Sequence, residues 1–142
     1  MLDIKCAGAL IYALDTQRFL FLYRARSKQS DVWGLPGGTV EASETPWIAC
    51  QREIKEEIGE INFSKIIPLE KYQSKNRAFE YHTYFCLTER EFLPILNEEH
   101  SGYVWTSYLK WPRPLHYGVK KTLDRKTNAS KIQTIFSTLV VN

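Results

Sequence analysis

One stretch constrains this chain more than any other: residues 37–59, which read GGTVEASETPWIACQREIKEEIG. Within it, Glu53, Glu56 and Glu57 stand at positions i, i+3 and i+4, so a helix would place the three carboxylates on one face. The apolar side chains of the same stretch fall on a neighbouring arc of such a helix, and we expect this arc to pack on the core. They are Trp47, Cys50, Ile54 and Ile58.

The limits of this helix are well marked in the sequence. Ser43 or Thr45 can cap its N-terminus, and Pro46 suits the first turn, where its missing N–H costs nothing. Gly59 is a typical residue at a helix C-terminus. The three glutamates therefore lie in the last two turns, at the negative end of the helix dipole, where anions are disfavoured.

A bound divalent cation would offset this unfavourable placement of charge. Carboxylate oxygens crowded on one face suit Mg²⁺ or Mn²⁺ rather than zinc. The alternative is a solvated helix face, which is what most runs of Glu and Lys are.

The surrounding residues favour the first interpretation. The stretch resembles the signature of the Nudix (MutT-like) hydrolases: Gly, five residues, Glu, seven residues, and then R-E-aliphatic-x-E-E-x-G-aliphatic. Gly38, Glu44 and residues 52–59 match every fixed position except the last, where Glu60 replaces the aliphatic residue and Ile61 follows. The resemblance implies an α/β/α sandwich with a mixed sheet.

The resemblance also implies a reaction, which is metal-dependent hydrolysis of a P–O–P bond in a nucleoside diphosphate linked to another group. Mg²⁺ or Mn²⁺ is the expected cofactor. The expected metal ligands are the Gly37 carbonyl, Glu53, Glu57 and, directly or through water, Glu56, which is alternatively the general base. Arg52 is expected to orient the carboxylates, Glu44 among them.

A second acidic region contains Asn97-Glu98-Glu99-His100 and lies before Trp105. Glu99 stands six residues before this Trp, as does a loop glutamate that reaches the metal site in the Nudix family. We expect Glu99 to be a further ligand or an alternative base. Taken alone, the same residues would be an ordinary acidic loop.

Candidate substrate contacts lie outside the acidic stretches. Arg24 and Arg26 fit either a phosphate-binding loop, since Arg binds phosphate oxygens bidentately, or a merely solvated one. His116 falls where related enzymes place a base-pocket residue. Residues 110–131 carry seven Lys or Arg and one Asp, which indicates a solvated basic face or, less often, a site for a nucleotide or RNA backbone.

The remaining pattern predicts a mixed sheet between helices, in a single domain over residues 1–142. Strands are expected at 4–14, 19–23, 62–73, 77–87 and 103–106, and further helices at 115–125 and 128–140. In the fourth strand, alternate residues from Phe79 to Leu87 share one face, where an aromatic ring would pack in the core or stack on a base.

Composition narrows the class of protein. A net charge of +3 names no partner, and no apolar run is long enough to cross a membrane. The N-terminus does not have the plan of a signal peptide, and three widely spaced cysteines are typical of reduced, buried thiols. We therefore expect a cytoplasmic protein without a membrane partner.

Two other functions remain open on the same scaffold. One is a nucleotide-binding or regulatory module without turnover, against which the complete acidic box argues. The other is C–O cleavage of a GDP-sugar with His100 as the base, a chemistry usually marked by an incomplete box. The substrate itself is open among ADP-ribose, dinucleoside polyphosphates, (d)NTPs, nucleotide sugars, FAD and capped RNA ends, and a homodimer is possible.

Overall fold

The structure is a computed structural model that describes residues 3–25 and 30–139. Within these ranges the chain forms seven strands and three helices. The strands are β1 (Ile4–Ala13), β2 (Arg18–Arg24), β3 (Val32–Gly34), β4 (Gly37–Thr39), β5 (Lys65–Gln73), β6 (Phe79–Thr88) and β7 (His100–Ser107). The helices are α1 (Pro46–Ile58), α2 (Tyr117–Asp124) and α3 (Lys126–Leu139).

The sheet is mixed, as expected, and β1 lies at its centre. β1 runs parallel to β6 along all ten residues, while it pairs antiparallel with β2 at one end and with β4 at the other. β5 extends the sheet beyond β6, and β2 also pairs with β3 and β7. β1 and β2, which follow each other in the chain, form an antiparallel pair in which Ala13 opposes Arg18.

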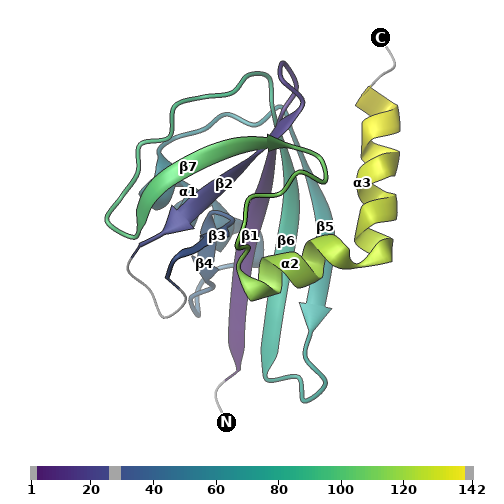
Figure 1. Ribbon diagram of the computed structural model, residues 1–142. Coiled ribbons are helices and arrows are strands. Elements are labelled where there is room, and N and C mark those ends of the chain that lie inside the picture. The colour runs from purple at the N-terminus through teal and green to yellow at the C-terminus, as the bar shows by residue number, and fades with distance from the viewer. Residues whose placement is uncertain (1–2, 26–29, 140–142) are drawn as a thin grey trace.

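Helices cover both faces of the sheet, which confirms the α/β/α sandwich. In Figure 1, α1 lies behind the sheet and α2 crosses in front of it, while α3 stands beside β5 at the right. Residues of α3 belong to the same core cluster as those of α2. The centre of β1 is buried on both faces because successive side chains point to opposite sides. Ala9 and Ile11 face α1, whereas Leu10 and Tyr12 face α2 and α3.

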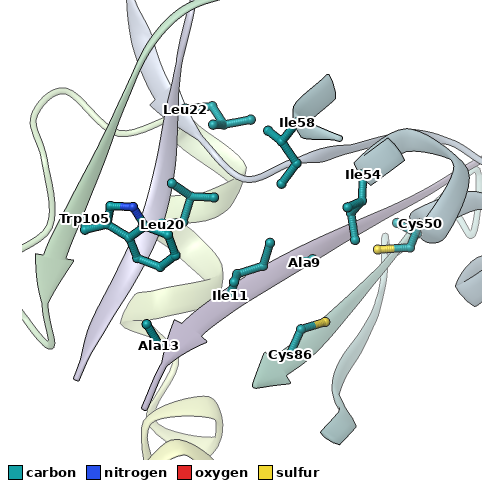
Figure 2. Packing of buried hydrophobic residues seen from close by; sticks show 11 residues of the cluster. Ala9, Ile11, Ala13, Leu20, Leu22, Cys50, Ile54, Ile58, Cys86 and Trp105 are labelled. Carbon is teal, nitrogen blue, oxygen red and sulfur yellow. The ribbon is translucent and has the colours of Figure 1, made fainter. Parts of the chain in front are cut away.

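The α1 side of the core contains the apolar arc predicted from the sequence. Cys50, Ile54 and Ile58 of α1 point toward the side chains of β1, β2, β6 and β7 (Figure 2). Trp47 is partly buried against the same cluster. On the opposite side, Val119 and Leu123 of α2 pack with residues of α3, β5 and β6.

Several predicted boundaries were wrong. The strand expected at 62–73 begins only at Lys65, and the short strand expected at 103–106 runs from His100 to Ser107. The last two helices form near the predicted places, as α2 and α3. In the described part of the chain, no helix has the length and apolarity needed to cross a membrane.

Candidate active site

Helix α1 begins and ends where the sequence predicts. Thr45, rather than Ser43, is the N-cap, and its side-chain oxygen accepts a hydrogen bond of 3.2 Å from the Ile48 N–H. Pro46 is the first helical residue. Gly59 closes the helix by donating its N–H to the Lys55 carbonyl at 3.2 Å.

The three glutamates of α1 share a face but not an environment. The side chain of Glu57 is 3% exposed, that of Glu53 is 17% exposed and that of Glu56 is 55% exposed. Burial thus increases across the carboxylate face from solvent toward the interior. A buried carboxylate needs compensation from a donor or a cation, and Glu57 needs it most.

Two adjacent glycines of β4 lie against these carboxylates. The Gly37 N–H donates a 2.7 Å hydrogen bond to Glu57 Oε1. A Cβ atom on Gly38 would lie 2.6 Å from the carboxyl carbon of Glu53, and a Cβ on Gly37 would collide with the Ala7 carbonyl of β1. Gly37 therefore requires the absence of a side chain, whereas a side chain at Gly38 would displace the Glu53 carboxylate.

Arg52 contacts several carboxylates of the acidic box, including the largely buried Glu44 and Glu53. Its Nε and Nη2 donate to the two carboxylate oxygens of Glu44 at 2.7 and 2.9 Å, and its Nη1 donates to Glu53 Oε1 at 2.9 Å. Nη2 also donates to the Thr39 carbonyl at 3.0 Å. The hydrogen bonds from Arg52 hold the pKa of Glu44 below its usual value. The orienting role expected of Arg52 requires such contacts, and it stays a prediction.

The second acidic region reaches the buried end of the carboxylate face. Glu57, Glu99 and His100 each offer one ligand atom, and these atoms lie within 4.8 Å of one another. His100 Nδ1 is 3.4 Å from Glu57 Oε2, yet it makes no hydrogen bond within the described ranges. Glu99 is exposed, whereas the other two are buried. Carboxylate oxygens and an imidazole nitrogen without a hydrogen-bond partner fit a divalent cation.

Without a metal ion, burial and neighbouring negative charges disfavour the ionised form of the carboxyl groups at this site, and a bound cation would offset this effect. Burial, followed by the charges of Glu53 and Glu99, raises the pKa of Glu57 to about 8, although the Gly37 N–H opposes this shift. Burial also raises the pKa of Glu53, against the hydrogen bond from Arg52. Burial and then the charge of Arg24 lower the pKa of His100 to about 4. Ionised carboxylates are thus disfavoured here without a positive ion.

A cavity of about 510 Å³ adjoins this cluster. Gly37 and Gly38 line it, so the same two residues contact both the cavity and the carboxylates. Cationic side chains and aromatic rings also line it, together with small and aliphatic residues. The cations are Arg24, Lys121 and Arg125, and the aromatic residues are Tyr72, Phe79, Tyr81, His116 and Tyr117.

Two of the three predicted substrate contacts lie at this cavity. Arg24, at the end of β2, is part of its lining. His116 is part of it too and also caps α2, where its Nδ1 accepts a hydrogen bond of 3.1 Å from the Gly118 N–H. Burial and the charge of Arg24 lower the pKa of His116. Arg26 lies outside the described residues.

Some lining residues were not predicted as site residues. Lys121 and Arg125 belong to the basic segment at residues 110–131, but the sequence of this segment did not indicate which of its basic residues line a cavity. Phe79 and Tyr81 belong to the alternating strand, and their face continues from the core residue Phe85 into the cavity. The alternation of side chains along the strand predicted which residues share a face, but it did not predict where on that face the core ends and the cavity begins.

Comparison with known proteins agrees with this geometry. The NUDIX domain profile matches residues 5–125. Dihydroneopterin triphosphate diphosphatase of Haemophilus influenzae is 31% identical over 117 residues, which cover 71% of this chain and 72% of that protein.

Two solved structures have the same fold. A MutT NUDIX hydrolase from Burkholderia pseudomallei gives a TM-score of 0.68 at 25% identity, over 89% of this chain and 99% of that one. RenU, a Nudix hydrolase from M. smegmatis, gives a TM-score of 0.74 at 19% identity, over 100% of this chain and 91% of that one. The chain therefore belongs to the NUDIX family, and it is a Nudix hydrolase acting on diphosphate bonds.

Proposed function

We propose that this hydrolase cleaves a P–O–P bond in a nucleotide-like substrate with the help of Mg²⁺ or Mn²⁺. One observation carries the proposal: Gly37 and Gly38 join a cluster of glutamates to a cavity lined by cations and aromatic rings. Such a cavity suits a planar heterocycle that carries phosphates, because the rings can stack and Arg side chains can bind phosphate oxygens.

In this proposal, the cation is held by Glu53 and Glu57, by Glu99 and by the Gly37 carbonyl. Glu56 is a ligand through water or the proton acceptor, and Glu99 is the alternative acceptor. A divalent cation bound there supplies charge neutralisation at phosphate oxygens and lowers the pKa of a water ligand.

The chain's own residues prepare the site before any substrate arrives. The Gly37 N–H fixes the orientation of the buried Glu57 carboxylate. Arg52 holds Glu53 in place and is itself held by Glu44 through two hydrogen bonds. Because phosphoryl transfer depends mainly on positioning and charge stabilisation, this prior order is a large part of what catalysis needs.

Substrate binding is assigned to the cavity. Arg24 contacts phosphate, and His116 lies beside the base together with Tyr81. The relative from Haemophilus influenzae is named for a pterin triphosphate, and a bicyclic heterocycle with a phosphate chain fits the same lining chemistry. Nucleoside triphosphates and dihydroneopterin triphosphate are therefore the first substrates to test.

The test is a panel of diphosphate-containing compounds incubated with Mg²⁺ in H₂¹⁸O, with products resolved by mass. Alongside the two triphosphate classes it includes ADP-ribose, dinucleoside polyphosphates, nucleotide sugars and 5′-triphosphate RNA. The proposal expects one ¹⁸O in a phosphate-containing product of at least one compound. Incorporation into a sugar hydroxyl would indicate C–O cleavage instead, and no turnover of any compound would contradict the proposal.

A further inference from the structure

His100 differs from an ordinary buried histidine because its Nδ1 has no hydrogen-bond partner in the described part of the chain. Its side chain is only 4% exposed, so bulk water does not solvate this nitrogen freely. A buried polar atom without a partner is costly and therefore rare in folded proteins. Either a proton acceptor or a cation is the natural complement of such a nitrogen.

The position of this nitrogen favours a cation. Nδ1 lies 3.4 Å from Glu57 Oε2, and a ligand atom of the exposed Glu99 completes a group within 4.8 Å. For metal–ligand bonds of about 2.1 Å, neighbouring ligand atoms lie about 3 Å apart and opposite ones about 4 Å apart. The 3.4 Å pair already has the spacing of neighbouring ligands, and the 4.8 Å limit of the group exceeds the spacing of opposite ligands by less than 1 Å, which a small rotation of the exposed Glu99 side chain would remove.

Glu99 lies in the turn that precedes β7, where the His100 N–H donates to the Asn97 carbonyl at 3.4 Å, so the alternation of a strand does not separate the side chains of Glu99 and His100. The pairing of β2 with β7 shifts register between Tyr23 and Arg24, so that Tyr23 opposes Gly102 and Arg24 opposes His100, leaving Ser101 extra. Such a bulge interrupts the strict alternation of side chains and redirects them. The Ala25 N–H donates to the Glu99 carbonyl at 2.9 Å, which fixes the start of β7 against the end of β2.

We propose that His100 Nδ1 is a ligand of the site's divalent cation, beside Glu57 and Glu99, and that this nitrogen makes the site favour Mn²⁺ over Mg²⁺. Mg²⁺ prefers oxygen ligands and retains its waters, whereas Mn²⁺ accepts imidazole nitrogen more readily. The inference rests on the proposed metal dependence and adds the identity of one ligand. It also gives His100 a role other than that of a proton acceptor.

Pulsed EPR of Mn²⁺ bound to the full chain reads the ligand directly, because a coordinated histidine nitrogen modulates the echo at ¹⁴N frequencies. The parent should show this modulation, and labelling histidine with ¹⁵N should change it. His100→Gln should abolish it, whereas the control His82→Gln should retain it. His82 is the matched control because its Nε2 already pairs with Glu80 Oε2 at 2.6 Å.

Calorimetric titration gives the second readout. His100→Gln should weaken Mn²⁺ binding by about 10-fold or more, on the scale of losing a residue that supports a metal site, and should weaken Mg²⁺ binding less. Bound Mn²⁺ without histidine modulation in the parent, or modulation that survives His100→Gln, would overturn the inference while leaving the proposed hydrolysis intact. Failure of the parent to bind either ion would overturn both proposals. If His100→Gln does not fold, the labelled parent is compared with His82→Gln and His116→Gln: modulation that survives in both variants assigns the nitrogen to His100, the third histidine of the chain, and modulation lost in either overturns the inference.

Discussion

Glu57 makes a strong prediction about stability in the absence of metal. Burial is the main reason that its pKa is raised from the ordinary 4.5 to about 8 in the folded protein. A carboxyl whose folded pKa is raised contributes stability that is fully present below its unfolded pKa. That stability is lost as the pH rises through the folded pKa, because the unfolded chain can ionise and the folded chain cannot. The metal-free protein should therefore lose stability from this group between pH 4.5 and about 8.

The size of the effect follows from the width of this window. Each pH unit within it costs about 1.4 kcal/mol, so raising the pH from about 5 to about 7.5 should remove roughly 3 kcal/mol of unfolding free energy. For a chain of this size that corresponds to roughly 10 °C in Tm. Glu57→Gln abolishes the titration while keeping the side-chain volume, and its amide oxygen can still accept the Gly37 N–H.

The assay is thermal unfolding of both proteins in excess EDTA at several values of pH between 5 and 8. The Tm of Glu57→Gln minus that of the parent should increase steadily with pH. Glu60→Gln is the control, since Glu60 is highly exposed beside Lys55 on the same helix end and should give no such trend. A difference between Glu57→Gln and the parent that stays constant with pH would refute the reasoning.

Three further predictions concern the metal, the cavity and the glycine pair. Saturating Mg²⁺ should raise the Tm of the parent more than that of Glu57→Gln. An ion present at about 100 times its Kd adds about 2.7 kcal/mol to the stability of a folded state that binds it. Equal Tm shifts in the two proteins would argue against a metal site at Glu57. Replacing Arg24 and Arg26 together with Ala should raise KM or lower kcat/KM on the best substrate and leave circular dichroism unchanged; unaltered kinetics would return both residues to the solvated-loop interpretation. Gly38→Ala should displace the Glu53 carboxylate, which lies where the new Cβ would stand. Because small misplacements of a catalytic group are costly, kcat should fall roughly 10-fold or more with little change in Tm. Parental kcat in this variant would show that catalysis does not depend on the position of the Glu53 carboxylate.

The helix of the acidic box was predictable because its signals are local. Thr45, Pro46 and Gly59 act within a turn of the residues they terminate, so sequence alone located both ends of α1. The core-facing arc followed from the helical period for the same reason.

The unequal environments of the carboxylates were not predictable. Glu57 is buried because β4 approaches it from 20 residues away, as the hydrogen bond from Gly37 shows, and because His100 reaches it from β7. Periodicity places three glutamates on one face but does not say which of them the rest of the chain covers. Contacts between segments that are distant in the sequence determine which of the glutamates is buried.

His100 illustrates the same limit. The sequence predicted a strand at 103–106, which would have left residue 100 in a loop. Pairing with β2 begins the strand at His100, and the register shift beside Arg24 then brings it to the carboxylates. A bulge between two strands so distant in sequence leaves no local signal.

If the buried carboxylates of α1 hold a cation required for hydrolysis, turnover must depend on both the ion and Glu57. Steady-state turnover of the best substrate is measured for the parent, Glu57→Gln and Glu60→Gln, each with Mg²⁺ and with excess EDTA. We expect EDTA to abolish turnover in the parent and added Mg²⁺ to restore it, Glu60→Gln to match the parent, and Glu57→Gln to lose roughly 10²-fold in kcat. Full turnover in EDTA, or parental kcat in Glu57→Gln, would contradict this dependence.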